Sequence, residues 1–145
     1  MKDIIKNKVR TYLTENGKQK NNLVGGVLIK CSKTNKLLLL LRNDGNKEEK
    51  WSFVTGGIDS GESVLDGLKR EVSEEIGVDP DIIKYKFIDT FDIDNNKVLH
   101  YYEGLVDEEF EAKINFEHHE YGWFGVDDLP SPLFKGTKEK INNHG

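Results

Sequence analysis

The sequence predicts an α/β fold in which a central mixed β-sheet is sandwiched between helices, an α/β/α arrangement. Residues 63–76 carry apolar side chains at helical spacing, and short apolar segments with strand character lie before and after them. Strands from both sides of one helix are expected to join in one sheet that the helix covers. The 145 residues are enough for one hydrophobic core, so we expect a single domain over residues 1–145.

The first part of the chain is expected to form an N-terminal extension followed by a β-hairpin. Residues 1–22 are rich in Lys and Asn, and four apolar side chains are spaced for one short amphipathic helix: Ile4, Ile5, Val9 and Leu13. Residues 23–31 (LVGGVLIKC) have the character of a buried strand, and residues 36–42 that of a second, Leu-rich strand. A turn over residues 32–35 would join these two strands.

The central helix is marked by sequence signals at both ends. A charged loop over residues 43–50 and a short strand over 51–54 lead into a glycine-rich loop over 56–61. Ser63 and the acid three residues later form a variant of the capping box, so the helix is expected to begin there. Gly77 supplies the left-handed residue that ends many helices.

The second half of the chain is expected to form mainly strands. Residues 85–93 and 97–106 predict a long hairpin, and an acidic connection over residues 107–113 follows it. The remaining expected elements are two short strands, a helical turn and a terminal helix, over residues 114–116, 121–126, 127–130 and 138–142 in that order.

Composition indicates the compartment and the partners. The chain is 36% hydrophobic and 32% charged with a formal net charge of −5, which argues against a stable nucleic-acid partner or an anionic membrane surface. Cys31 is the single cysteine, so no intramolecular disulfide can form. The first ten residues lack the apolar run of a secretory signal, and residues 37–41 are far too short for a membrane span. We therefore expect a cytoplasmic protein.

Three glutamates of the central helix form a candidate metal site. At about 100° per residue, Glu71 and Glu75 lie roughly 40° apart around the helix axis, and Glu74 lies about 60° further round. Glu71 and Glu75 would border the apolar stripe and be partly shielded from water. Adjacent carboxylates repel one another, and a divalent cation relieves that repulsion. Oxygen ligands favour Mg²⁺, with Mn²⁺ as a substitute.

The spacing of these residues matches a longer pattern. Residues 56–78, GGIDSGESVLDGLKREVSEEIGV, read G-x5-E-x7-R-E-U-x-E-E-x-G-U, where U is aliphatic, and every specified position is filled. This pattern is the Nudix box, and over roughly residues 23–130 the chain resembles the Nudix hydrolase family. The resemblance implies the α/β/α Nudix fold and the hydrolysis of a diphosphate that is linked to some other group.

The resemblance also implies roles for the residues of the box. The three glutamates would bind the metal and serve catalysis, and the carbonyl oxygen of Gly56 would join them as a ligand. Glu62 and Arg70 match a structural ion pair that holds the loop against the helix. In such a site Mg²⁺ orients the diphosphate and lowers the pKa of the attacking water, and one carboxylate acts as general base.

A second acidic segment lies before the expected closing strand. Residues 117–123, EHHEYGW, match the E-H-x-x-Y-x-W segment that many Nudix enzymes carry there. The resemblance implies that Glu117 is an extra metal ligand or general base, with Glu120 as the alternative. A solvated loop is the competing interpretation for both residues. His118 and His119 are expected to be loop residues, because Mg²⁺ prefers oxygen ligands.

Substrate contacts are predicted from residue type alone. Arg42 ends an expected strand and could reach a terminal phosphate, although a surface arginine is the equal alternative. The aromatic candidates for stacking on a base or sugar are Trp51, Phe53, Phe91, Tyr101 and Tyr102. Alternation along the strands places about half of these rings in the core.

We expect Mg²⁺-dependent hydrolysis of a small nucleotide-like diphosphate, with a nucleoside triphosphate or a pterin triphosphate favoured. The entrance Val54-Thr55-Gly56 is similar to that of dihydroneopterin triphosphate pyrophosphatases, whereas residues 117–123 also resemble diadenosine polyphosphate hydrolases. Dinucleoside polyphosphate, ADP-ribose and nucleotide-sugar hydrolases are therefore alternatives, as is a non-catalytic nucleotide sensor. The net acidity counts against an RNA substrate. The family resemblance leaves a homodimer open.

Overall fold

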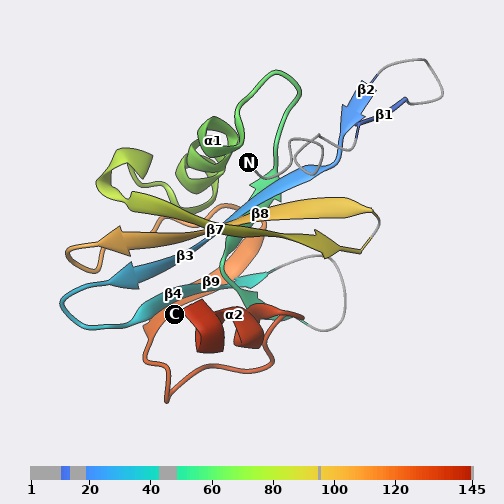
Figure 1. Ribbon diagram of the computed structural model, residues 1–145. Helices are drawn as coiled ribbons and strands as arrows, with labels where there is room; N and C mark the ends of the chain where they lie inside the picture. Colours follow the sequence, from blue (N-terminus) through green and yellow to red (C-terminus); the bar gives the residue numbers. More distant parts are fainter. Residues whose placement is uncertain (1–10, 14–18, 43–48, 95, 145) are drawn as a thin grey trace.

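The computed structural model describes residues 11–13, 19–42, 49–94 and 96–144. Its main sheet has seven strands in the order β5-β4-β3-β8-β7, with β6 paired to β3 and β9 paired to β4. These strands are β3 (Leu23–Cys31), β4 (Leu37–Arg42), β5 (Trp51–Ser52), β6 (Val54–Gly57), β7 (Lys84–Ile93), β8 (Lys97–Val106) and β9 (His118–Phe124). Helices α1 (Val64–Ile76) and α2 (Thr137–His144) lie on opposite sides of the sheet (Figure 1). The predicted α/β/α fold with a mixed sheet is confirmed.

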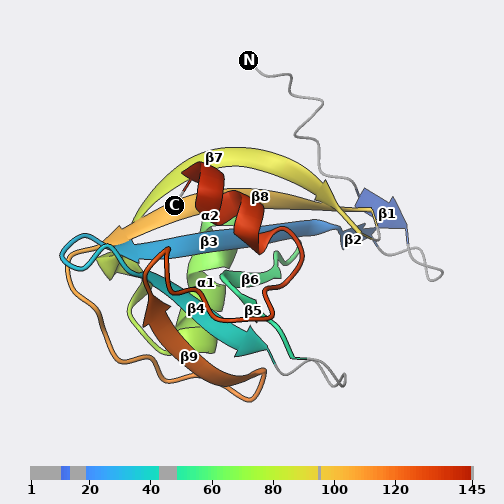
Figure 2. The same ribbon diagram turned by 90° about the horizontal axis from the view of Figure 1, so that it is seen from below.

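Strand β3 lies at the centre of the sheet, and both of its faces are buried. It pairs in parallel with β8 along its whole length, and antiparallel with β6 and β4. Alternate side chains of β3 and β4 enter two cores. On the α1 side, Val27, Ile29, Leu38 and Leu40 pack with Leu68, Val72 and Ile76, and on the α2 side Leu28, Leu37 and Leu39 pack with Ile141. In Figure 2, α2 lies in front of β3 and β8, with α1 behind the sheet. Burial on both faces explains why both strands are nearly continuous apolar runs.

Helix α1 begins and ends where the sequence predicts. The Ser63 hydroxyl accepts a hydrogen bond from the Asp66 amide at 3.1 Å. Gly77 has φ of 65° and donates its amide hydrogen to the Ser73 carbonyl. Buried Leu68 lies in the apolar stripe, whose packing on the sheet fixes the rotation of the helix about its axis. The glutamates of the helix are thereby held beside β6.

Two predictions in the first half of the chain are wrong for part of their residues. Residues 11–13 and 19–21 form a small antiparallel sheet of β1 (Thr11–Leu13) and β2 (Gln19–Asn21), not a helix. Ile4, Ile5 and Val9 lie outside the described residues, as does most of the charged loop 43–50. Gly56 and Gly57 belong to β6 rather than to a loop, because they pair with Gly25 and Val24 of β3.

The strands and helices in the second half of the chain follow largely in the predicted order, but they begin and end at other residues than predicted. The β7–β8 hairpin is confirmed, and a short 3₁₀ helix (Pro80–Ile82) precedes it. The strand predicted over 114–116 is wrong, because β9 begins only at His118, where it pairs with Arg42 of β4. A single turn, closed by the Asp128 amide and the Gly125 carbonyl, replaces the predicted helical turn. No helix in the described part of the chain is long and apolar enough to cross a membrane.

Candidate active site

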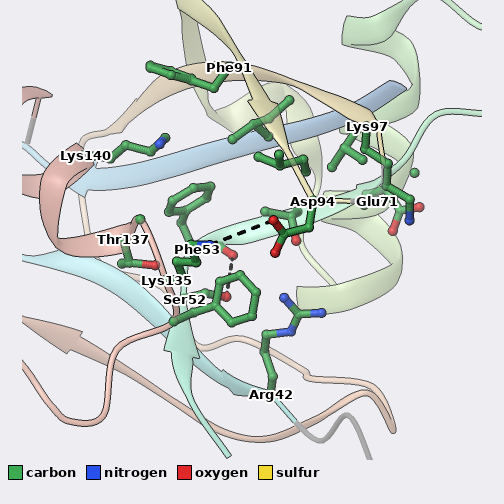
Figure 3. Close-up of a pocket in the computed structure, with 18 of the residues that line it drawn as sticks. Arg42, Ser52, Phe53, Glu71, Phe91, Asp94, Lys97, Lys135, Thr137 and Lys140 are labelled. Carbon is green, nitrogen blue, oxygen red and sulfur yellow. Dashed lines mark hydrogen bonds and ion pairs between the residues drawn. The ribbon is translucent and has the colours of Figure 1, made fainter. Parts of the chain in front are cut away.

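A cavity of about 980 Å³ lies between the glutamates of α1 and helix α2 (Figure 3). Glu71, Glu75, Gly56 and Glu117 line it, together with residues of β7, β8 and α2. In Figure 3, Glu71 lies on the opposite side of the cavity from the side chains of α2. The cavity therefore has an acidic end and a second end of different chemistry.

Glu71 and Glu75 form the buried part of the acidic end. The Glu75 residue is 3% exposed, and the Glu71 side chain is 14% exposed. Burial raises the pKa of Glu71 to about 8, and the neighbouring Glu75 adds to the shift while Arg70 opposes it. Burial raises the pKa of Glu75 to about 7, and the negative charge of Glu117 acts in the same direction. Two desolvated carboxyls so close together retain protons unless a cation neutralises them.

Gly56 allows the main chain of β6 to lie against this pair. A Cβ atom at residue 56 would lie 2.1 Å from Cδ of Glu71, which no side chain can tolerate while Glu71 keeps its position. The absence of a side chain at this glycine thus lets the main chain of β6 approach the Glu71 carboxylate closely. Its role as a metal ligand stays a prediction.

Arg70 joins the segment after β6 to helix α1. Its Nε and Nη2 atoms donate to the two carboxylate oxygens of Glu62 at 2.8 and 3.0 Å. Nη2 also donates to the Gly57 carbonyl at 3.0 Å, and Nη1 donates to Glu71 at 3.0 Å. The bonds from Arg70 to Glu62, together with one from the Asp59 amide at 2.8 Å, lower the pKa of Glu62 to about 2. The ion pair fixes both the loop and the position of the Glu71 carboxylate.

Replacing Glu62 by Gln is expected to lower the melting temperature near neutral pH by a few degrees. Because Glu62 has a pKa of about 2 when folded, against 4.5 for an ordinary carboxyl, its stabilisation is present above pH 4.5 and is lost as pH falls toward 2. Thermal unfolding of both proteins at several pH values measures this difference. A gap between wild type and variant that is constant down to pH 2 would contradict the ion-pair explanation.

Glu74 occupies a different position from the other two glutamates of α1. Its side chain is 56% exposed and accepts a hydrogen bond from Nη1 of Arg70 at 3.3 Å. It is not among the residues that line the cavity. Its role as a metal ligand therefore rests on the family pattern and stays a prediction.

His118 is a candidate site residue, although the sequence predicted a loop residue at this position. Its Nε2 atom lies 3.1 Å from Oε1 of Glu75, and its side chain is 7% exposed. Ligand atoms of Glu75, Glu117 and His118 all lie within 4.8 Å of one another. Burial lowers the pKa of His118, which favours the neutral imidazole that metals bind. Its place beside Glu117 in the matched segment was the available signal. By contrast, His119 is exposed and pairs with Glu49.

The predicted substrate contacts divide into two groups. Arg42 and Phe53 line the cavity, as does Phe91. Trp51 and Tyr102 do not, which corrects their assignment as stacking residues. Trp51 packs edge-on against Phe124 at 5.2 Å between ring centroids, and Tyr102 packs against Tyr85 and Phe87. Their positions along the strands direct these two rings into packing clusters.

Comparison with known proteins places the chain in a family. A family model described as the NUDIX domain matches residues 21–143, most of the chain. The chain belongs to the Nudix family. It is accordingly a Nudix pyrophosphohydrolase, and the predicted hydrolase class is confirmed.

Individual relatives differ in their named substrates. An RNA pyrophosphohydrolase from Campylobacter jejuni is 28% identical over 145 residues, covering 89% of this chain and 87% of that protein. The dihydroneopterin triphosphate pyrophosphohydrolase of E. coli has a similar structure, with a TM-score of 0.68, 19% identity and coverage of 86% and 95%. An Ap4A hydrolase binary complex from C. elegans has a TM-score of 0.64, 19% identity and coverage of 72% and 81%. At these identities the two structures show the fold alone.

The donor set of this Nudix domain fits a divalent cation. Nudix enzymes typically use such a metal, and here carboxylate oxygens and one imidazole converge on one end of the cavity. Burial raises the pKa of Glu71 and of Glu75, and Arg70 opposes this shift only in part at Glu71, so a cation would stabilise the ionised form of both carboxyls.

Mg²⁺ or Mn²⁺ is expected to raise the melting temperature by several degrees, and more at high pH. Because Glu71 and Glu75 have pKa values of about 8 and about 7, against an ordinary 4.5, the folded protein holds extra protons and loses stability as pH rises through that range. Metal and protons compete for these carboxylates, so metal stabilises most where they are deprotonated. Thermal unfolding with metal and with chelator, above pH 8 and below pH 7, measures the effect. If the metal raised the melting temperature equally at both pH values, it would bind at residues other than Glu71 and Glu75.

Proposed function

We propose that this Nudix enzyme cleaves a diphosphate linkage in a small nucleotide-like substrate, with Mg²⁺ as cofactor and Mn²⁺ as substitute. A nucleoside triphosphate or a pterin triphosphate is the favoured substrate class. The observation that supports this proposal most is the cavity itself, because an acidic, metal-compatible end and an aromatic end lie in one hollow. Such a cavity accommodates a diphosphate at one end and a ring at the other.

Metal binding, proton transfer and phosphate binding would be divided among residues of the acidic end and Arg42. Glu71, Glu75 and Glu117 would hold the cation, with Glu74 and the Gly56 carbonyl as the further ligands that the family pattern implies. Bound Mg²⁺ supplies charge neutralisation and lowers the pKa of the attacking water. A carboxyl with a raised pKa suits the general base, which receives the water proton. Arg42, which lines the cavity, offers positive charge for a terminal phosphate.

The 5′ end of RNA is a second candidate substrate. The relative from Campylobacter jejuni is named an RNA pyrophosphohydrolase and aligns with most of this chain. A 5′-terminal nucleotide presents the same triphosphate as a free nucleotide. The net charge of −5 disfavours extensive contacts to further phosphates, so we place the mononucleotide first.

Phosphate release from a substrate panel tests the proposal. The panel contains nucleoside triphosphates, a pterin triphosphate, a dinucleoside polyphosphate, ADP-ribose and a 5′-triphosphorylated RNA. Each is assayed with Mg²⁺ and with chelator. For the triphosphates, added pyrophosphatase makes either inorganic product detectable. For ADP-ribose and the dinucleoside polyphosphate, whose hydrolysis releases only phosphate esters, added alkaline phosphatase converts the products to inorganic phosphate. Mg²⁺-dependent release from a nucleoside triphosphate or from the pterin triphosphate supports the favoured class, whereas release from the RNA alone would support the second candidate. Nucleotide binding without any hydrolysis would instead indicate a sensor.

A further inference from the structure

We propose that the end of the cavity beneath α2 selects a heterocycle bearing a ring carbonyl, as in 6-oxopurines and 4-oxopteridines, and that Lys140 recognises this carbonyl. The inference deepens the proposed function and rests on it for the diphosphate part of the substrate. It is carried by the surroundings of Lys140, by the aromatic walls and by an unpartnered buried hydroxyl.

Lys140 lies among aromatic rings rather than among carboxylates. Its Nζ atom is 4.0 Å from the ring centroid of Phe91 and 5.8 Å from that of Tyr101. Lys140 lines the cavity, and burial lowers the pKa of its ammonium group. Within the described ranges, no ion pair joins it to a carboxylate. The ammonium group thus keeps hydrogen-bonding capacity that a ligand can use.

The walls around Lys140 suit a flat ring. Phe53, Phe91 and Leu99 line the same cavity, and Phe53 and Phe91 both contact Tyr101, at 5.3 and 6.2 Å between ring centroids. Aromatic side chains favour stacked or edge-on contacts with another ring. Figure 3 shows Phe53, Phe91 and Lys140 on the side of the cavity away from Glu71. The base of a bound nucleotide, rather than its phosphates, would therefore occupy this end.

The hydrogen-bonding chemistry of Lys140 then selects among bases. An ammonium group only donates, so it satisfies a carbonyl oxygen and leaves an exocyclic amino group without an acceptor. Lysine contacts the O6 and N7 atoms of guanine for this reason. A phosphate is a poorer occupant, because burying a multiply charged anion between apolar rings with one cation leaves most of its oxygens unsatisfied.

Thr137 supplies a second polar group on the same helix. The residue is fully buried and lines the cavity one turn before Lys140. Its hydroxyl has no hydrogen-bond partner among the residues that the structure describes. Buried hydroxyls are normally paired, so this one is available to a neighbouring ring atom of the same ligand. Because this hydroxyl can both donate and accept, it does not distinguish a ring carbonyl from an exocyclic amino group. The preference for the carbonyl would therefore come from Lys140 alone.

ITP and ATP form a matched pair for the test, because they differ only at ring position 6 and its neighbouring proton. With Mg²⁺, kcat/KM is expected to be about tenfold higher for ITP, within the discrimination typical of one good base contact. Lys140→Met keeps the length and apolar stem of the side chain while removing the ammonium group. It is expected to reduce the ITP preference to about threefold or less, chiefly through loss of ITP turnover. Lys138→Met, at an exposed position on the same helix, should keep the full preference.

Binding of the monophosphates IMP and AMP provides a readout that needs no hydrolysis. Calorimetry is expected to show tighter binding of IMP to the wild type and equal binding of both to Lys140→Met, with unchanged circular dichroism. Equal binding of IMP and AMP to the wild type, or a preference that survives Lys140→Met, would overturn the inference. If IMP is preferred but no triphosphate is hydrolysed, the recognition of the base stands and the proposed enzyme function fails.

Discussion

Glu75→Gln is expected to lower kcat by about 100- to 1,000-fold while leaving the fold intact, as typically follows from removing one group that stabilises transition-state charge. Glu75 is buried, lies 3.1 Å from His118 and shares the acidic end of the cavity with Glu71 and Glu117. The amide is nearly isosteric with the carboxylate but carries no charge for a cation. Steady-state kinetics with saturating Mg²⁺ measures the loss.

The stability of the same variant separates a catalytic from a structural role. Because burial raises the pKa of Glu75 to about 7, its ionised form destabilises the metal-free fold above that pH. Glu75→Gln should therefore have an equal or higher melting temperature than the wild type in chelator at high pH, and a smaller gain from Mg²⁺. A purified, folded variant with wild-type kcat would remove Glu75 from the metal site.

Glu74→Gln is a useful comparison for that experiment. The family pattern implies a similar loss of activity, although the Glu74 side chain is 56% exposed and contacts Arg70. A large loss would support the ligand role that the pattern implies. A kcat near that of the wild type would limit the metal site to the carboxylates that line the cavity.

Helix α1 could be predicted because its signals are local. The cap at Ser63, the apolar stripe and the stop at Gly77 all lie within one short segment, and the periodicity of a helix sets the relative directions of its side chains. Glu71, Glu74 and Glu75 are all on this one helix. Their proximity follows from the sequence without knowledge of the rest of the fold.

Contacts between distant segments could not be predicted in the same way. His118 and Glu75 are 43 residues apart, and they meet because β9 pairs with β4 and shifts register between Leu41 and Arg42. Nothing local marks that register shift. The glycines at 56 and 57 were misread for a related reason, since their turn-like composition is overridden by pairing with β3.

The residues at the proposed ring-binding end of the cavity could not be predicted from the sequence either. Trp51 and Phe53 lie two residues apart, yet only Phe53 lines the cavity, because Trp51 packs against Phe124 of β9. Lys140 lies in a terminal helix with no motif, and it reaches Phe91 only through the packing of α2 on the sheet. Residue type alone does not distinguish a ring in the core from a ring in the cavity.

Glu117→Gln is expected to lower kcat by about tenfold or more, because the change removes a carboxylate that would serve as a metal ligand or general base. Glu117 lines the cavity, and one of its carboxylate oxygens lies within 4.8 Å of the ligand atoms of Glu75 and His118. Its negative charge also contributes to the raised pKa of Glu75, so the variant should lower that pKa and shift the acid limb of the pH–rate profile to lower pH. Kinetics across pH measures both effects.

Glu120→Gln is the matched control for this change. Glu120 lies in the same β9 strand, is exposed and pairs across the sheet with Leu41, and it does not line the cavity. It is expected to keep wild-type kcat and pH profile. A loss of less than threefold in Glu117→Gln, together with a larger loss in Glu120→Gln, would move the catalytic role to Glu120. Small losses in both would leave the buried carboxylates of α1 and His118 as the complete acidic end of the site.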